Sequence, residues 1–273
     1  MADKPLDGKV ALITGAGSSM GMGREMALAL AEAGARVALM DINAEQLERN
    51  VNDAREVGGD GSALPIVGSV HSWDDAQRAV SETISGLGGL HVLVNNAGIP
   101  SRRLAGFWEL PPEEWVQTIS VNASGPFIMA RAAIGHLREQ GWGRIVGVTT
   151  SLDTMIRNLP YGPSKSAHES FVAIIAKQLE GSGVTANVLI PGGATNTNFI
   201  SNVDVRDRDA LIQPVVMRAP IAWLASDEAD GINGRRIIAS KWDENLPIEQ
   251  RLEVAAAPAA WPQLGRPPEE QGP

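Results

Sequence analysis

Short apolar runs alternate with helix-like stretches along most of this chain, and that alternation restricts the folds open to it. Strands that alternate with helices are typical of a parallel sheet, because each helix carries the chain back to the start of the next strand. We therefore predict an α/β fold with a doubly wound parallel sheet, flanked by helices and joined by right-handed crossovers. The predicted strands are residues 9–14, 36–40, 63–67, 90–94, 144–149, 184–190 and 235–239.

The stretches between these strands predict helices, and no linker or internal repeat divides the chain. Residues 1–244 are therefore expected to form one domain. From residue 245 onward the sequence is rich in proline, so residues 245–273 are predicted to be a tail that is partly mobile or packs at a subunit interface. The predicted helices are residues 22–33, 73–85, 112–140 and 161–180.

Composition excludes several classes of function. The chain has 273 residues, 44% of them hydrophobic, which is enough for a sizeable core. Its net charge of −9 argues against a nucleic-acid surface, and the absence of cysteine excludes disulfides and thiolate metal sites. The four histidines show no metal-ligand spacing, so no metal is expected. Without an apolar membrane span or secretory signal, a cytoplasmic protein is expected.

A glycine-rich turn follows the first predicted strand and opens the first predicted helix. Gly15, Gly17 and Gly21 lie in this turn, with Ser18 and Ser19 between them. Small residues allow the backbone to approach a pyrophosphate closely, and the positive end of the following helix favours an anion. The turn therefore indicates a nucleotide site, with an ordinary glycine-rich connection as the alternative.

Asp41 stands at the end of the second predicted strand. A carboxylate at this place accepts hydrogen bonds from an adenosine ribose 2′-hydroxyl and repels a 2′-phosphate. The next two residues, Ile42 and Asn43, supply no cation. These residues favour NAD over NADP as the cofactor, and the alternative is an aspartate that only caps the following helix.

Tyr161, the only tyrosine in the chain, precedes Lys165 by four residues in a predicted helix. Residues at this spacing lie on one helix face. A neighbouring ammonium favours the phenolate, so the pair is suited to proton transfer near neutral pH. The alternative is two surface residues that share the spacing by chance.

Asn122 lies four residues before Pro126 in the predicted helix 112–140. Because proline has no backbone N–H, the carbonyl of Asn122 loses its usual donor and is free to hold a water molecule. A proline kink with no further role is the alternative.

In their order along the chain, these features resemble the short-chain dehydrogenase/reductase family. The resemblance covers roughly residues 4–239. It implies a single Rossmann-type domain, a homodimer or homotetramer, and hydride transfer between a nicotinamide and a carbonyl or secondary alcohol. The motifs that carry it are the turn 15–23, Asn95-Asn96-Ala97-Gly98, Asn122, Tyr161 with Lys165, and Pro191-Gly192.

The resemblance also implies roles for individual residues. Tyr161 would be the general acid/base, and Lys165 would lower its pKa and hold the nicotinamide ribose. A water on Asn122 would relay the proton, and the hydroxyl of Ser151 would steady the substrate oxygen. The implied cofactor-binding residues are Gly15, Ser18, Ser19, Gly21, Met22, Asp41, Ser69, Val70, Asn96, Gly98, Tyr161, Lys165, Pro191, Gly192, Ala194 and Thr197.

The glycine turn and the adenine side depart from the family pattern. The family turn reads Thr-Gly-x-x-x-Gly-x-Gly, whereas five residues separate Gly15 from Gly21. Phosphate contacts are therefore expected from the backbone of Ser18, Ser19 and Met22. After the third predicted strand, Ser69 and Val70 stand where the family often has an aspartate.

The position of the catalytic hydroxyl also departs from the pattern. Ser151 precedes Tyr161 by only ten residues, a shorter spacing than the family's usual one. Counting along the preceding strand places Thr150 at the serine's usual position instead. Ser151 is the first expectation and Thr150 the second, and the wall of the substrate pocket is expected to be unusual here.

The leading hypothesis is an NAD-dependent oxidoreductase of secondary alcohols or ketones. The segments that border the family's pocket suggest a partly apolar small molecule as substrate, since they contain Phe107, Trp108, Met155, Ile156, Leu159 and Phe199. Two alternatives are an NAD-binding regulatory protein with impaired catalysis and an NAD-dependent epimerase or dehydratase.

Overall fold

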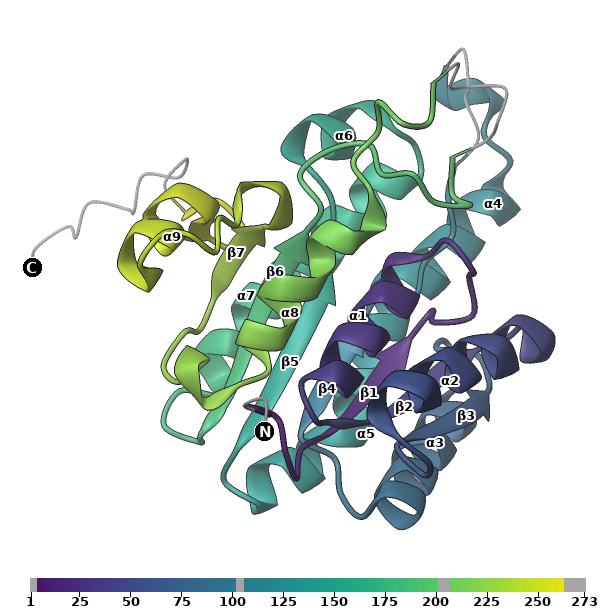
Figure 1. The fold of residues 1–273 in the computed structure, drawn as a ribbon. Coiled ribbons are helices and arrows are strands. Elements are labelled where there is room, and N and C mark those ends of the chain that lie inside the picture. The colour runs from purple at the N-terminus through teal and green to yellow at the C-terminus, as the bar shows by residue number, and fades with distance from the viewer. Residues whose placement is uncertain (1–3, 102–105, 201–206, 263–273) are drawn as a thin grey trace, which may run out of the picture.

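The computed structural model describes residues 4–101, 106–200 and 207–262, and it places a single sheet at the centre of the molecule (Figure 1). Within the described residues the sheet has eight strands in the order β3-β2-β1-β4-β5-β6-β7-β8. All neighbouring strands are parallel except β7 and β8. This confirms the predicted α/β fold. The strands are β1 (Val10–Thr14), β2 (Arg36–Asp41), β3 (Ala63–Val67), β4 (Val92–Asn95), β5 (Gly143–Val148), β6 (Val184–Ile190), β7 (Arg235–Ile238) and β8 (Ala256–Pro258).

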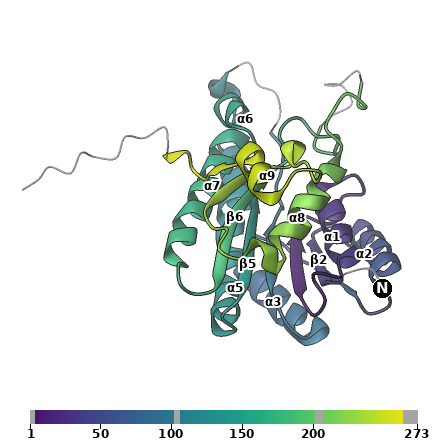
Figure 2. The same cartoon turned by 60° about the vertical axis from the view of Figure 1, so that its left-hand side comes forward.

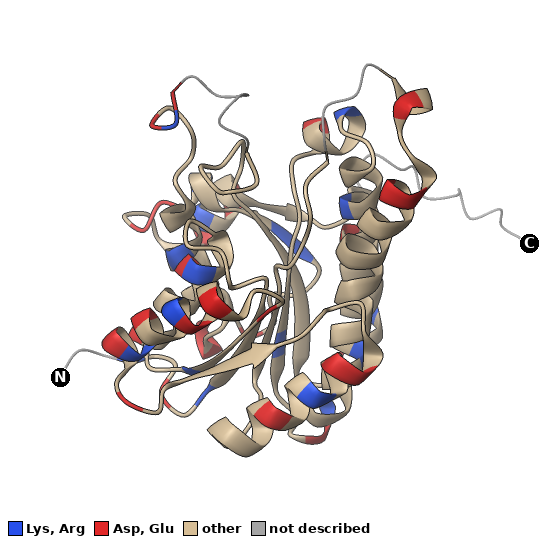
Figure 3. Ribbon diagram, turned by 90° about the vertical axis from the view of Figure 1, so that its right-hand side faces the viewer, with Lys and Arg blue, Asp and Glu red and all other residues tan. Residues whose placement is uncertain are grey.

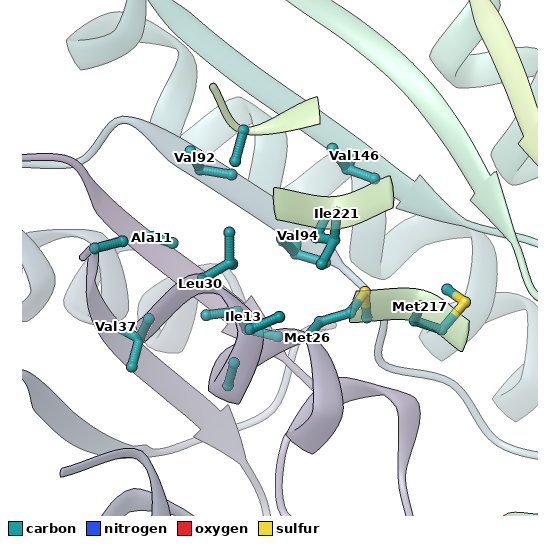
Figure 4. Close-up of a cluster of buried hydrophobic side chains, with 14 of the residues drawn as sticks. Ala11, Ile13, Met26, Leu30, Val37, Val92, Val94, Val146, Met217 and Ile221 are labelled. Carbon is teal, nitrogen blue, oxygen red and sulfur yellow. The ribbon is translucent and has the colours of Figure 1, made fainter. Parts of the chain in front are cut away.

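Helices cover both faces of the sheet (Figures 1 and 2). One core joins the sheet to α1, α2 and α8, and Figure 4 shows part of it. A second core on the opposite face joins the sheet to α3, α5 and α7. The helices are α1 (Met22–Glu32), α2 (Ala44–Gly58), α3 (Trp73–Leu87), α4 (Pro112–Ile119), α5 (Gly125–Glu139), α6 (Leu152–Arg157), α7 (Tyr161–Gln178), α8 (Arg218–Leu224) and α9 (Ile248–Ala255).

Burial explains why the strands appear in the sequence as continuous apolar runs. Every residue of β1, β5 and β6 is buried, because helices cover the sheet on both sides. Charged residues lie mainly on the helices and loops around it (Figure 3). Two arginines are exceptions, since Arg144 of β5 is 2% exposed and Arg236 of β7 is 6% exposed.

The predicted helix 112–140 consists of three segments. A π-helical segment, Ser120–Ser124, joins α4 to α5. In this wider turn the Gly125 N–H donates to the Ser120 carbonyl, five residues earlier in the chain. The next residue, Pro126, has no N–H to donate. The proline therefore alters the helix at Asn122, where the sequence predicted a disturbance.

The C-terminal region contains more regular structure than a proline-rich tail suggests. Residues 248–255 form α9, and β8 pairs antiparallel with β7, with Arg236 opposite Ala257. The sheet therefore extends past residue 245, while residues 263–273 lie outside the described part of the chain.

The strand order reverses between β1 and β4. The chain builds β1, β2 and β3 toward one edge and then continues from β4 toward the other. In doubly wound sheets, ligands bind outside the carboxyl ends of the strands at this point of reversal. Among the described residues, no helix is both long enough and apolar enough to span a membrane.

Candidate active site

A cavity of about 320 Å³ opens at the carboxyl ends of β1, β4, β5 and β6. It therefore lies where the strand order predicts a ligand site. The cavity brings together the glycine turn, the segment after β4, the end of β5 and the start of α7. Its lining residues include Gly15, Ser18, Gly21, Met22, Asn96, Gly98, Thr150, Tyr161, Lys165, Pro191, Ala194 and Thr197, all of them candidates from the sequence.

The enlarged glycine turn is held from outside by Asn50 of α2. The Asn50 side-chain amide is buried and donates to the carbonyls of Ala16 at 2.6 Å and Ser18 at 3.2 Å. The turn ends at Gly21, the N-cap of α1, which provides no side-chain cap for the first N–H groups of the helix. These N–H groups lie beside the cavity and are suited to bind an anion.

Asp41 closes the outer side of the turn. One carboxylate oxygen accepts from the Gly17 N–H at 2.8 Å, and the other accepts from the Asn43 N–H at 3.1 Å. A Cβ atom at Gly17 would lie 2.6 Å from the Asp41 Cγ, so only glycine permits this approach. The structure therefore couples the turn to Asp41, which is not among the cavity-lining residues. Contact of Asp41 with an adenosine ribose remains a prediction.

Ser69 and Val70 take part in local packing and are not among the cavity-lining residues. The Ser69 hydroxyl lies 2.8 Å from His71 Nδ1, and its N–H donates to Asp75. This hydrogen bond, with others from Arg78 and Ser72, lowers the pKa of Asp75. Val70 packs against Gly125. Contact of Ser69 and Val70 with adenine remains a prediction.

Asn96 supports the glycine turn from the segment after β4. Its side-chain amide donates to the carbonyls of Thr14 and Gly15, each at 3.0 Å. The Thr14 hydroxyl in turn accepts from the N–H groups of Asn96 and Ala97. Asn96 therefore contributes to the site both as lining and as a clamp between β1 and β4.

Asn122 connects the segment after β4 to α7. Its buried side chain accepts from the Ile99 N–H at 2.8 Å and donates to the Ser164 hydroxyl at 3.1 Å. A Cβ atom at Gly98 would lie 3.2 Å from Asn122 Oδ1 and 3.4 Å from Lys165 Nζ. Asn122 and Lys165 therefore adjoin one small space beside the cavity.

Tyr161 and Lys165 lie on one face at the start of α7. Lys165 Nζ donates to the Val148 carbonyl at 2.9 Å and lies 5.7 Å from the centroid of the Tyr161 ring. Burial lowers the pKa of Lys165 to about 8. Burial raises the pKa of Tyr161 above its ordinary value of 10.0, so the expected lowering by Lys165 is not found in this structure. Desolvation of the phenolate outweighs the ammonium here.

The two candidate hydroxyls at the end of β5 differ in position. Ser151 is the N-cap of α6: its hydroxyl accepts from the Thr154 N–H at 3.2 Å and lies 2.9 Å from the Thr154 hydroxyl. Thr150 lines the cavity, whereas Ser151 is not among the lining residues. The geometry thus supports the second sequence expectation over the first.

The segment after β6 forms the wall opposite α7. Pro191, Ala194 and Thr197 line the cavity, while Gly192, with φ of +104°, makes the turn beside them. The Phe199 ring packs edge-on to Tyr161, with 6.0 Å between their centroids. Residues 201–206, which follow this segment, lie outside the described part of the chain.

The family assignment rests on the whole of this arrangement and on the sequence itself. Residues 9–207 match the family model described as short chain dehydrogenase. The chain belongs to the short-chain dehydrogenase/reductase family. This confirms the resemblance inferred from the sequence motifs.

Relatives of this short-chain dehydrogenase/reductase differ in cofactor and substrate. The chain is 33% identical to D-threitol dehydrogenase of Mycolicibacterium smegmatis over 86% of its length and 93% of the relative's. It is 30% identical to an NADPH-dependent aldehyde reductase-like protein of Arabidopsis thaliana, covering 85% and 93%. A 3-ketoacyl-(acyl-carrier-protein) reductase from Brucella melitensis, solved in complex with NADH, superposes with a TM-score of 0.74 at 29% identity, covering 84% of this chain and 95% of that one.

Several site residues of this short-chain dehydrogenase/reductase were missed in the sequence. Thr154 and Asn158 enter the cavity from the short connection that contains α6, and Ser101 and Thr195 line it too. Asn50 carried a readable signal, since it shares a helix face with the buried Leu47 and Val51. A polar residue on the apolar face of a helix indicates a specific partner.

Proposed function

We propose that this protein is an NAD(H)-dependent oxidoreductase that interconverts a ketone and a secondary alcohol. The observation that carries the proposal is the convergence of Tyr161, Lys165 and Thr150 on one cavity that also reaches the N-terminus of α1. The nicotinamide dinucleotide, when bound, supplies or accepts the hydride. Its phosphates fit the uncapped helix end, and its adenosine ribose fits Asp41.

Tyr161 and Thr150 have different roles at the reacting oxygen. In reduction, Tyr161 donates a proton to the substrate oxygen, and its raised pKa keeps the phenol protonated for this role. The Thr150 hydroxyl donates a hydrogen bond to the same oxygen while negative charge develops there. Lys165 would then return a proton from solvent to Tyr161, through water held beside Asn122, since Asn122 and Lys165 adjoin one space.

Turnover tests this proposal directly. We expect the purified protein to oxidise NADH in the presence of a panel of cyclic, aromatic and aliphatic ketones, and to reduce NAD with the matching secondary alcohols. Saturable NADH binding without turnover on any of them would favour the impaired, regulatory alternative. A cofactor that stays bound through purification and is never consumed would favour the epimerase or dehydratase alternative.

We propose NAD rather than NADP because Asp41 holds a carboxylate at the adenosine end of the site. Arg24, which lines a hollow beside Ser19, does not supply a free cation for a 2′-phosphate, since it donates to Asp53 at 2.9 and 2.6 Å. The named relatives include NADH and NADPH proteins, so the choice depends on residues of this chain.

Asp41→Ala is expected to lower the preference for NADH over NADPH by about ten- to hundredfold, because a charged hydrogen bond is lost together with a repulsion. The measurement is the ratio of kcat/KM for the two cofactors. The same change at Asp60, an exposed aspartate between α2 and β3, provides the control. An unchanged ratio in Asp41→Ala would remove Asp41 from this role.

Burial of Lys165 predicts a pH-dependent stability. The pKa of Lys165 is about 8 when folded and 10.5 as the ordinary value, so the unfolded chain holds more protons between these values. The free energy of unfolding therefore rises with pH across this window, by about 3 kcal/mol from this group. Urea unfolding of wild type and Lys165→Met, both without cofactor, isolates the effect. A wild-type-minus-variant difference that is constant with pH would contradict the assignment.

We propose that the protein is a homodimer or homotetramer that pairs through α5 and α7, in the cytoplasm. Phe127 on α5 and Ile174 on α7 are each 52% exposed, and Phe127 packs against Phe171 across the two helices. Light scattering of the purified protein measures the assembly. A monomer at micromolar concentration would contradict this pairing.

A further inference from the structure

A buried ion pair lies directly behind the end of β5. Glu169 of α7 is fully buried, Arg236 of β7 is 6% exposed, and the Arg236 guanidinium donates to the Glu169 carboxylate. A buried ion pair is seldom a net source of stability, because removing both charges from water carries a large penalty. Its neighbours therefore indicate what else it does.

The pair fixes both residues at the end of β5. The Glu169 carboxylate accepts from the Thr149 hydroxyl at 2.8 Å. The second arm of the Arg236 guanidinium donates to the carbonyl of Thr150. Each charged group thus contacts one of the two threonines that enter the cavity.

The backbone needs this support because the sheet ends here. The last bond between β5 and β6 in this region joins the Thr149 N–H to the Leu189 carbonyl at a long 3.4 Å. Beyond it, Arg236 holds the Thr150 carbonyl, and α6 begins at Leu152. An oxyanion donor acts only when it is held in place before the reaction.

The sequence places Glu169 on the same face as the catalytic pair. Tyr161, Lys165 and Glu169 follow one another at intervals of four residues in α7. This spacing forms a single stripe along the helix. One helix therefore orients the proton donor and also anchors the strand end that carries Thr150.

The C-terminal segment completes the arrangement. The Ala260 N–H donates to the second oxygen of Glu169 at 3.2 Å, and the Trp261 ring centroid lies 5.7 Å from the Arg236 guanidinium carbon. Pairing of β8 with β7 brings this segment to the ion pair. Residues 256–261 are thus part of the support of the cavity.

We propose that Glu169 and Arg236 are positioning residues for the Thr150 hydroxyl, and that the segment after β8 holds them in place. This inference rests on the proposed function, because it gives Thr150 the role of donor to the substrate oxygen. It adds to that function a second set of residues, none of which lines the cavity.

A charge-balanced double variant tests the pair without leaving a lone buried charge. In Glu169→Gln/Arg236→Met, the glutamine oxygen can still accept from the Ala260 N–H while its amide NH2 donates to the Thr149 hydroxyl, whereas the Thr150 carbonyl loses its donor. We expect kcat to fall about ten- to hundredfold, because small misplacements at a reacting centre have effects of this size. The KM for NADH should stay unchanged.

The matched control lies at the other end of the same strand. Arg144 of β5 is also buried and pairs with Asp230. Arg144→Met/Asp230→Asn likewise removes a buried arginine of the sheet together with its carboxylate partner, although the Asp230 side chain is 64% exposed. Neither residue lines the cavity, and we expect the kcat of this variant to equal that of the wild type. Equal losses of kcat in the two double variants would reduce the Glu169–Arg236 pair to a structural role.

A double-mutant cycle identifies the residue through which the pair acts. In a Thr150→Val background, the Glu169→Gln/Arg236→Met change should cause no further loss of kcat. An independent, multiplying loss would overturn the proposal. If the double variant does not fold, Trp261→Ala, which removes only the ring beside Arg236, should show a smaller loss of the same kind, and an unchanged kcat would overturn it.

Hydrogen–deuterium exchange separates this inference from the proposed function. Exchange of residues 149–157 should accelerate in Glu169→Gln/Arg236→Met but not in the control. If the wild type turns over no ketone, the proposed function fails, yet faster exchange still supports the anchoring of Thr150. Unchanged exchange overturns the positioning role whatever the activity.

Discussion

Tyr161→Phe is expected to lower kcat by about a thousandfold, within the range for loss of a general acid. The substitution removes only the phenolic oxygen, so the ring contact with Phe199 is retained. The affinity for NADH should therefore be unchanged. Stopped assays of NADH oxidation, with a ketone that the wild type reduces, measure the first effect, and fluorescence titration measures the second.

Two outcomes would count against this role for Tyr161. Retained turnover in Tyr161→Phe would show that another group supplies the proton. A large loss of NADH affinity would show that the substitution damaged the cavity rather than the chemistry. Phe199→Leu, which alters the neighbouring ring and keeps the hydroxyl, is the matched control and is expected to change KM for the ketone more than kcat.

Thr150→Val is expected to lower kcat by about a hundredfold, the loss typical of one oxyanion donor. Valine keeps the branched shape of threonine and removes the hydroxyl of a residue that lines the cavity. The adjacent substitution Ser151→Ala should leave kcat near the wild-type value and instead destabilise the fold by about 1 kcal/mol, because it removes the N-cap of α6.

If the two variants behaved in the opposite way, Ser151 rather than Thr150 would be assigned as the donor to the substrate oxygen. If Ser151→Ala abolished turnover while Thr150→Val did not, the first expectation from the sequence would hold, and the cap of α6 would have to open for catalysis. The comparison requires kcat, KM and a urea unfolding curve for each variant. A common loss in both would point to disturbance of the strand end as a whole.

Much of the fold was predictable because its elements are strongly patterned. The strands β1, β5 and β6 are buried throughout, so their apolar runs are unambiguous. The helix α2 was not predicted, because it is polar apart from a narrow stripe that includes Leu47 and Val51. The strand β8 has only three residues and ends in Pro258, so it is too short to show the apolar pattern that predicts a strand.

The site was predictable where short spacings carry the geometry. Tyr161 and Lys165 share a helix face by their separation alone, and the turn and Asp41 follow from the ends of neighbouring strands. Contacts between distant segments were not predictable in this way. Glu169 and Arg236 are 67 residues apart, and nothing local in the sequence pairs them.

The choice between Thr150 and Ser151 could not be made by counting residues along the sequence. Spacing from Tyr161 and register along β5 disagree, because the connection between them is shortened. In the structure α6 begins directly after β5 and uses the Ser151 hydroxyl as its cap, which is why we propose Thr150 as the donor. The start of α6 therefore uses Ser151, the residue that was the first expectation from the sequence.

The central claim, that the cavity is an NAD(H) site, is tested most directly by parallel titrations of the wild-type protein with NADH and NADPH. Quenching of the emission of the seven tryptophans reports binding. We predict saturable binding of both or of NADH alone, with NADH the tighter ligand. Tighter binding of NADPH would contradict the role of Asp41, and failure of both to bind would contradict the claim itself.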